Sequence, residues 1–352
     1  MKADFTIKLM KWNQVLNRRS MPWKNEKDPY RIWLSEIILQ QTRVEQGWAY
    51  YEKFIHEFPT VSDLAKAPAK KVFKLWEGLG YYSRCRNLIE TAKRIATEYK
   101  GRFPSNYNAI AGLKGIGPYT AAAISSFAFN LPYPVLDGNV HRVLARYFGI
   151  TTPIEYAPGR KFYDLLASAL IDQRKPGIYN QSIMDFGAII CKPMNPACST
   201  CPLAVDCMAY QHHWVSILPV KKKRAEKKSR WFLYFLVETE DHQVYIRRRE
   251  GKDIWKDLYE FPLFESVNPM PDSPEFFSGR VKKLLGRQAF SEMKISKAYK
   301  QELTHQTIHA RFSSLRIRKP LSNMDGFLLV SRKRIYSYPF PRLLNAFLKD
   351  AG

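Results

Sequence analysis

Apolar residues recur at three- to four-residue spacing throughout residues 1–220, with Gly and Pro between the periodic segments. This spacing places an apolar stripe along one side of a helix, so each segment predicts a helix that packs against others. The first part of the chain is therefore predicted to be all-α. The expected helices cover residues 6–18, 31–48, 69–76, 84–99, 119–129, 139–148, 160–171 and 179–190.

The pattern changes after residue 230. Short runs of β-branched and aromatic residues follow, among them WFLYFLVE, HQVYIRRR and TIHARFSSLRIR, and such runs are typical of strands. Helical segments are expected only at 274–285 and 341–348. This part of the chain is therefore predicted to be α+β.

A strongly basic segment, KKKRAEKKSR at residues 221–230, separates the two patterns. Seven of its ten residues are Lys or Arg, and only Glu226 is acidic. Such a run does not pack into a core and is best interpreted as a solvated linker. We expect a helical domain at 1–217, a linker at 218–230 and an α+β domain at 231–352.

The charge of the chain indicates a polyanionic partner. The 352 residues include 56 Lys and Arg against 32 Asp and Glu, a formal net charge of +24. Nucleic acid is the first candidate, because cations that neutralise phosphates release condensed counterions. A basic protein without such a partner is the alternative.

The sequence predicts neither a membrane-spanning helix nor a secretory signal. Prolines interrupt the longest uncharged stretch, 115–136, and the first residues lack the pattern of a secretory signal. We expect a monomer without a membrane partner, cytoplasmic and, in a bacterium, associated with the nucleoid.

Four of the five cysteines lie within seventeen residues, spaced Cys-x6-Cys-x2-Cys-x5-Cys. Four soft thiolates in one loop can enclose a single metal centre and leave no ligand position open. An iron–sulfur cluster fits this compact spacing best, while zinc and disulfides are the alternatives. The fifth, Cys85, is expected to be a small buried residue. The candidate ligands are Cys191, Cys198, Cys201 and Cys207.

The sequence LKGIGPYT at residues 113–120 predicts a tight hinge between two helices. Gly115 and Gly117 permit the turn, and Pro118 suits the first turn of the following helix. Free N–H groups at such a helix start can hold a DNA phosphate without reading the bases. The alternative is an ordinary turn between packed helices.

Two acids stand out because of their surroundings. Glu36 lies in the apolar segment IWLSEIILQQT, where desolvation would favour its neutral form, as a general acid requires. Asp137 follows PYPVL and opens the helix near Asn139. The alternatives are a satisfied core carboxylate for Glu36 and a helix N-cap for Asp137. Two carboxylates in one pocket are the equipment for cleaving a glycosidic bond.

These motifs together resemble the endonuclease III superfamily of DNA glycosylases. The segments SEIILQQTRVE, GLGYYSRCRNL, GIGPYTAAAI and VLDGNVHRVLAR are similar to the MutY-type adenine DNA glycosylases of that superfamily. The resemblance implies a helix-hairpin-helix glycosylase domain with a 4Fe–4S cluster in loop 191–207, followed by a MutT-like, or Nudix-like, α+β domain.

The resemblance also implies a reaction. Tyr119 stands where a lysine attacks the sugar in the relatives that also cut the strand, and a tyrosine cannot form a Schiff base. The implied activity is therefore that of a monofunctional hydrolase in base excision repair. It would release adenine mispaired with 8-oxoguanine, or with guanine, from double-stranded DNA and leave an abasic site.

Carried over by resemblance, Glu36 would protonate the adenine and Asp137 would stabilise the sugar cation, with Tyr119 and Asn139 ordering that carboxylate. The adenine must first leave the base stack. Gln41 and Tyr81 match residues that lie beside the flipped base. Ordinary helix surface or core packing is the alternative for Gln41, Tyr81 and Trp23. The matches to the adenine pocket are Arg19, Met21 and Trp23, and the hinge glycines Gly115 and Gly117 would contact DNA.

The C-terminal part resembles the MutT-like domain that recognises 8-oxoguanine in the opposite strand. Leu303, Thr304 and His305 occupy the positions of the family's Phe-Ser-His loop. The expected helix at 274–285 has only Glu275, so a magnesium–pyrophosphate site is implausible and the domain should bind rather than hydrolyse.

Three other functions compete with this interpretation. A glycosylase/lyase for oxidised pyrimidines is disfavoured by Tyr119 and by the extra domain. A non-catalytic iron–sulfur DNA-binding protein is disfavoured by the presence of both Glu36 and Asp137. A Nudix hydrolase fused to a DNA-binding domain is disfavoured by the missing acids.

Overall fold

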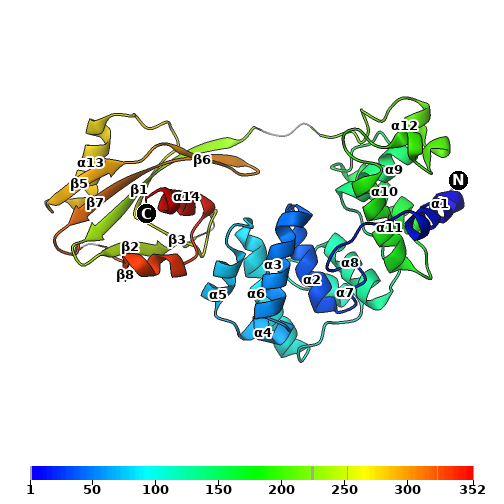
Figure 1. Ribbon diagram of the computed structural model, residues 1–352, viewed down its shortest axis with the longest axis horizontal. Coiled ribbons are helices and arrows are strands. Elements are labelled where there is room, and N and C mark those ends of the chain that lie inside the picture. Colours follow the sequence, from blue (N-terminus) through cyan, green and yellow to red (C-terminus); the bar gives the residue numbers. More distant parts are fainter. Residues whose placement is uncertain (1, 223–225, 252, 323, 352) are drawn as a thin grey trace. The chain divides into compact units, whose positions relative to one another are not determined.

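The computed structural model describes residues 2–222, 226–251, 253–322 and 324–351 (Figure 1). The chain divides into two compact units, Met1–Ala67 with Arg86–Lys223, and Pro68–Cys85 with Arg224–Gly352. The segment Pro68–Cys85, which the sequence places in the helical domain, thus groups with the C-terminal residues. The first strand starts at Lys228, inside the range expected to be linker.

The first unit is helical in the part that the structure describes. Helix α5 (Ala69–Trp76) lies in the second unit, and α6, at residues 82–98, begins in the second unit and ends in the first. The α-helices that lie wholly or partly in the first unit are α1 (Lys2–Val15), α2 (Pro29–Leu39), α3 (Val44–Glu57), α4 (Val61–Lys66), α6 (Tyr82–Glu98), α7 (Tyr107–Ala111), α8 (Pro118–Phe129), α9 (Gly138–Tyr147), α10 (Ala157–Leu170), α11 (Pro176–Ile189) and α12 (Met208–Gln211).

The expected single helix at 31–48 is wrong, because two helices, α2 and α3, occupy this range. The backbone of Gln41 has a φ of 60°, a left-handed conformation that ends the first helix. Residues 40–43 at the break are polar but include no Gly or Pro, so the sequence does not mark the end of a helix here. Helices α4, α7 and α12 were not expected, since each has six residues or fewer and cannot show a repeating stripe.

The core of the first unit joins the start of the chain to helices far along it. Phe5, Leu9 and Trp12 of α1 are buried together with residues of α9, α10 and α11. The Thr6 hydroxyl donates to the Leu170 carbonyl at 2.8 Å. Helix α2 is buried over most of its length against α8 and α3, and its N-terminus is capped by Asp28. This burial explains why most residues of its sequence, PYRIWLSEIIL, are apolar.

The second unit contains a mixed sheet whose path runs β3-β2-β1-β7-β5, with β4 on β1, β6 on β7 and β8 on β2. Its long central strands β1 and β7 are parallel, paired from Lys228 with Gln306 to Thr239 with Ile317. The strands are β1 (Lys228–Thr239), β2 (Gln243–Arg248), β3 (Tyr259–Glu260), β4 (Leu263–Ser266), β5 (Phe290–Ile295), β6 (Tyr299–Glu302), β7 (Gln306–Ile317) and β8 (Leu328–Ser331).

Two helices cover this sheet, α13 (Pro274–Leu285) and α14 (Arg342–Asp350) (Figure 1). Leu233 and Phe235 of β1 lie in one apolar cluster with Phe277 of α13. Phe312 of β7 instead stacks on Phe347 of α14, with ring centroids 3.9 Å apart. The three expected strands and both expected helices are thus present. The unexpected strands are short, so alternation is visible over few residues.

Candidate active site

Glu36 lies on α2 with only 8% of its surface exposed. Because burial disfavours the carboxylate, the pKa of Glu36 is raised to about 7, and the nearby negative charge of Asp137 raises it further. The Tyr119 hydroxyl, from α8, donates a hydrogen bond to Glu36 and partly offsets that shift. A carboxyl group with this pKa holds a proton near neutral pH and can deliver it to a substrate.

Asp137 is the N-cap of α9, which is the structural role that the sequence offered as an alternative to catalysis. One carboxylate oxygen accepts from the Val140 backbone N–H at 2.7 Å, and the other accepts from Asn139 Nδ2 at 2.8 Å. Burial raises the pKa of Asp137, while these hydrogen bonds favour the charged form. Arg142 in turn donates to the Asn139 side-chain oxygen at 2.9 Å. The carboxylate is thus fixed in direction by the helix that it caps.

The position of Tyr119 differs in one respect from the role that the resemblance implies. Its hydrogen bond goes to Glu36 rather than to Asp137, whereas Asn139 does bond to Asp137 as expected. Burial raises the pKa of Tyr119 well above its ordinary value, so the phenol stays neutral and acts as a donor. Tyr119 therefore orients the acid and not the second carboxylate.

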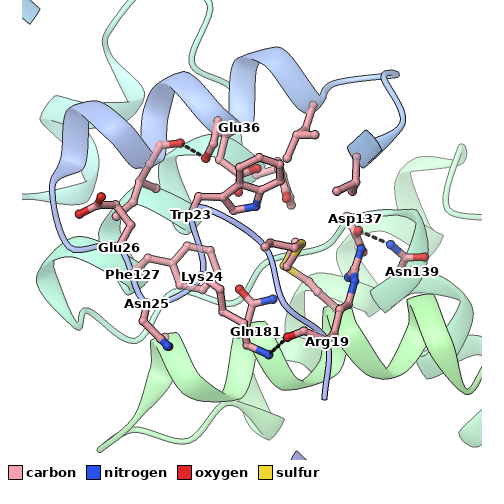
Figure 2. Close-up of a pocket in the computed structure, with 18 of the residues that line it drawn as sticks. Arg19, Trp23, Lys24, Asn25, Glu26, Glu36, Phe127, Asp137, Asn139 and Gln181 are labelled. Carbon is pink, nitrogen blue, oxygen red and sulfur yellow. Dashed lines mark hydrogen bonds between the residues drawn. The ribbon is translucent and has the colours of Figure 1, made fainter. Parts of the chain in front are cut away.

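A cavity of about 420 Å³ brings the two carboxyl groups together (Figure 2). Seven residues of the predicted site besides Tyr119 line it, drawn from α2, the loops after α1 and α2, and the start of α9. Lys24, Gln181 and Met184 also line it and were not predicted. The seven are Arg19, Met21, Trp23, Glu36, Gln41, Asp137 and Asn139.

The pocket segment at 19–24 is held by packing as well as by polar contacts. Met21 is buried, and the Trp23 ring lies against Tyr51 and Trp48 of α3, at centroid distances of 5.5 and 6.4 Å. Gln41 is exposed at the break between α2 and α3, and it reaches the same cavity. The local sequence gave no sign that these segments meet.

The glycine hinge joins α7 to α8 as expected. Gly115 has a φ of 77°, and a Cβ there would lie 2.5 Å from the Asn87 Cβ, so this position requires glycine. Gly117 caps α8 ahead of Pro118, with open space where a Cβ would be. Exposed backbone at a helix start is suited to contact a phosphate oxygen.

The remaining predicted DNA contacts lie in the second unit. Thr304 and His305 are exposed at the turn between β6 and β7, while Leu303 is half-buried and its N–H donates to the Gln306 carbonyl at 2.8 Å. Tyr81 follows α5 with a φ of 48°, and its hydroxyl shares a hydrogen bond with that of Thr304. The structure therefore brings these two predicted residues together.

The four clustered cysteines are free thiols that line one small cavity beside α9. Burial raises the pKa of Cys201 to about 12, so its thiolate needs a neighbouring cation. Arg146 supplies positive charge, with Nη1 3.5 Å from Cys191 Sγ. The donor set suits a soft metal centre, although no three such side chains among the described residues are arranged at metal-binding geometry.

Comparison with known proteins decides the family. Residues 34–158 match "HhH-GPD superfamily base excision DNA repair protein", and residues 233–350 match "NUDIX domain". The adenine DNA glycosylase of Buchnera aphidicola subsp. Schizaphis graminum is 38% identical over 74% of this chain and 75% of its own length. The adenine DNA glycosylase of Buchnera aphidicola subsp. Baizongia pistaciae is 34% identical over 86% of this chain and 83% of its own length. The chain belongs to the adenine DNA glycosylase family.

As a member of this family the protein is a DNA glycosylase, a hydrolase of N-glycosyl bonds that acts in base excision repair. Solved structures agree. A thermostable thymine-DNA glycosylase has 32% sequence identity and a TM-score of 0.56, covering 60% of this chain and 97% of its own. An endonuclease III–DNA covalent intermediate shares the fold at 18% sequence identity and a TM-score of 0.53. The match covers 61% of this chain and 99% of that chain. Within the described residues, no helix is long and apolar enough to cross a bilayer.

Proposed function

We propose that this adenine DNA glycosylase removes adenine paired with 8-oxoguanine, or with guanine, by hydrolysis alone, and leaves an abasic site. The observation that carries the proposal is the pairing, in one cavity, of a protonated Glu36 with an Asp137 carboxylate held by its helix cap. A proton donor and a fixed anion are the two groups that a dissociating glycosidic bond requires.

The chemistry follows from these two groups. A flipped adenine in the cavity accepts the proton of Glu36, so that the base leaves as a neutral molecule. Positive charge then develops on the sugar, and the anionic Asp137 stabilises it without having to reorganise, because the Val140 and Asn139 hydrogen bonds hold it in place. The Glu36 carboxylate left behind can accept a proton from the attacking water.

The lysines of the cavity support hydrolysis rather than strand cleavage. Lys24 Nζ donates to the Arg19 carbonyl at 2.6 Å and lies 3.2 Å from the Asp185 carboxylate. Lys27 Nζ donates to the Phe127 carbonyl at 3.0 Å. A lysine nucleophile needs a side-chain nitrogen that is free to attack the sugar, whereas both of these nitrogens are hydrogen bonded. Tyr119 holds the position of the lysine in the strand-cutting relatives.

Binding to duplex DNA is supported by the net charge of +24 and by the hinge at Gly115 and Gly117. Recognition of the opposite base is assigned to the β6–β7 turn, where Thr304 and His305 present a hydroxyl and a ring nitrogen to solvent. The bond between Tyr81 and Thr304 links this turn to the segment expected beside the flipped base. The protein is proposed to act as a monomer.

The four clustered cysteines are proposed to hold a 4Fe–4S cluster. When bound, the cluster would cross-link the loop at 191–207, because each cysteine thiolate ligates one iron. Purified protein is expected to be yellow-brown, with about four iron atoms per chain, and Cys198→Ser should lower both colour and iron content. Cys85→Ser, at a buried cysteine outside the loop, should leave both unchanged. A colourless wild-type protein with stoichiometric zinc would refute the cluster.

Single-turnover cleavage of defined duplexes tests the proposed activity. The substrates carry adenine opposite 8-oxoguanine, adenine opposite guanine, and an oxidised thymine opposite adenine, each analysed with and without alkali. Breaks in the adenine strand that appear only after alkali are expected, faster opposite 8-oxoguanine, since an abasic site survives until alkali opens it. Breaks without alkali on the oxidised thymine would replace this proposal with a lyase.

The same assay tests the recognition turn. Thr304→Val keeps the shape of the side chain and removes the hydroxyl, so the rate preference for 8-oxoguanine over guanine should shrink by about tenfold, the value of one hydrogen bond. Thr307→Val makes the same substitution at a buried position on β7 and is the matched control, which should keep the preference for 8-oxoguanine. An unchanged preference in Thr304→Val would remove that hydroxyl from the recognition site.

A further inference from the structure

A buried carboxylate behind the cavity connects two of its walls. Asp185 of α11 is fully buried. One of its oxygens accepts from Arg19 Nη1 at 2.9 Å and from Gln181 Nε2 at 2.9 Å. The other accepts from Asn17 Nδ2 at 2.8 Å and from Lys24 Nζ at 3.2 Å. Arg19, Lys24 and Gln181 all line the cavity, as Figure 2 shows, and each donates a hydrogen bond to Asp185.

The contact with Asp185 determines how Gln181 faces a ligand. A carboxylate only accepts hydrogen bonds, so the group that Gln181 turns toward Asp185 is its NH₂. The amide oxygen is then available to the cavity as an acceptor. A 6-aminopurine offers it a donor, whereas a 6-oxopurine places a second acceptor against it and leaves both unsatisfied. A fixed Gln181 therefore discriminates between these two classes of base.

Asp185 also controls charge in the cavity. Arg19 and Lys24 bring two positive charges to a site where the departing base is protonated and the sugar becomes cationic. Both cationic groups contact the same buried carboxylate, and Lys24 is held further by the Arg19 carbonyl. Their charge is partly neutralised by this carboxylate. Without Asp185 the two cations would oppose the transition state.

We propose that Asp185 is a positioning residue that makes the cavity selective for a 6-aminopurine, by fixing the Gln181 amide and by partly neutralising the charges of Arg19 and Lys24. This inference rests on the proposed function, since it concerns the base that the cavity accepts. Asp185 touches the cavity residues and not the substrate.

A double-mutant cycle tests this role. Single-turnover rates are measured for deoxyadenosine and for deoxyinosine, both opposite 8-oxoguanine, with wild type, Asp185→Asn, Gln181→Met and the double variant. Asp172→Asn is the matched control, because it makes the same charge change outside the cavity and keeps the hydrogen bonds that Asp172 accepts from the Arg174 and Lys175 N–H groups. Binding to a duplex with an uncleavable abasic analogue, circular dichroism and melting temperature show whether each variant folds.

Asp185→Asn is expected to slow adenine release at least tenfold and to reduce the ratio of the adenine and hypoxanthine release rates by about tenfold. Its binding to the abasic analogue should persist. The control Asp172→Asn should behave as wild type. In the Gln181→Met background, Asp185→Asn should not change the ratio further. An unchanged ratio, or additive effects on it, would overturn the proposal. If Asp185→Asn does not fold, an unchanged ratio in Gln181→Met overturns it equally. Failure of the proposed function is distinguishable, because wild type would then release no adenine.

Discussion

Glu36→Gln should bind its duplex as tightly as wild type and release almost no adenine. The amide keeps the size and the hydrogen-bonding capacity of the side chain but cannot donate a proton at neutral pH. Loss of a general acid costs about 10²- to 10⁴-fold in rate. The measurement is single-turnover release opposite 8-oxoguanine, together with binding to a duplex that carries a non-cleavable adenine analogue. Undiminished release would exclude Glu36 as the acid.

The pH dependence gives an independent signature of the same group. Burial raises the pKa of Glu36 to about 7, so the proton needed for the reaction is present below that pH and is lost above it. The wild-type rate should therefore fall above pH 7, approaching about tenfold per pH unit. Glu45→Gln, at an exposed position on α3, is the matched control and should keep both the rate and this decline.

Asp137→Asn should slow the release of adenine by about 10³-fold, the scale on which a preorganised electrostatic group contributes to a transition state. Asparagine is also a good N-cap, so α9 should keep its start and the protein its melting temperature. Asp28→Asn, at the N-cap of α2, makes the same substitution outside the cavity and should retain most of the activity. A rate equal to wild type would reject the assignment of Asp137.

The residual activity of Asp137→Asn carries a second test. The negative charge of Asp137 raises the pKa of Glu36, so its removal should lower that pKa. The decline in rate on the alkaline side should then begin at a lower pH than in wild type. A merely structural Asp137 would leave the profile in place, because a loss of folded enzyme scales the rate equally at every pH.

The sequence could reveal the two carboxylates because the evidence for each is local. Glu36 is an acid inside an apolar helix, and Asp137 is an acid at a helix start. The first criterion also fits Asp185 in SIMDFGAII, a residue that is not among the predicted site residues. Its partners could not be found in this way. Asn17, Arg19 and Lys24 lie 168, 166 and 161 positions away, and only the packing of α1 against α11 brings them near.

The elements that sequence could not reveal share a physical cause. The break at Gln41 depends on backbone angles in the polar segment 40–43, which contains no Gly or Pro to mark the end of a helix. Strands such as β3 and β6 have two and four residues, so few side chains show alternation, and their place is set by the strands beside them. The long β1 and β7 are buried along most of their length and are recognisable from composition alone.

During synthesis, β1 leaves the ribosome well before β7, its parallel partner, because the segment 240–305 separates the two strands. Until β7 arrives, one long edge of KSRWFLYFLVET is unpaired, and apolar strand edges of this kind promote aggregation. Parallel pairing between distant segments is also slow, since the intervening chain must be ordered first. A chain that contains β1 but ends before residue 306 lacks β7 and leaves this strand edge unpaired and exposed. We therefore expect termination between residues 240 and 305 to yield insoluble protein rather than a shorter enzyme with relaxed specificity.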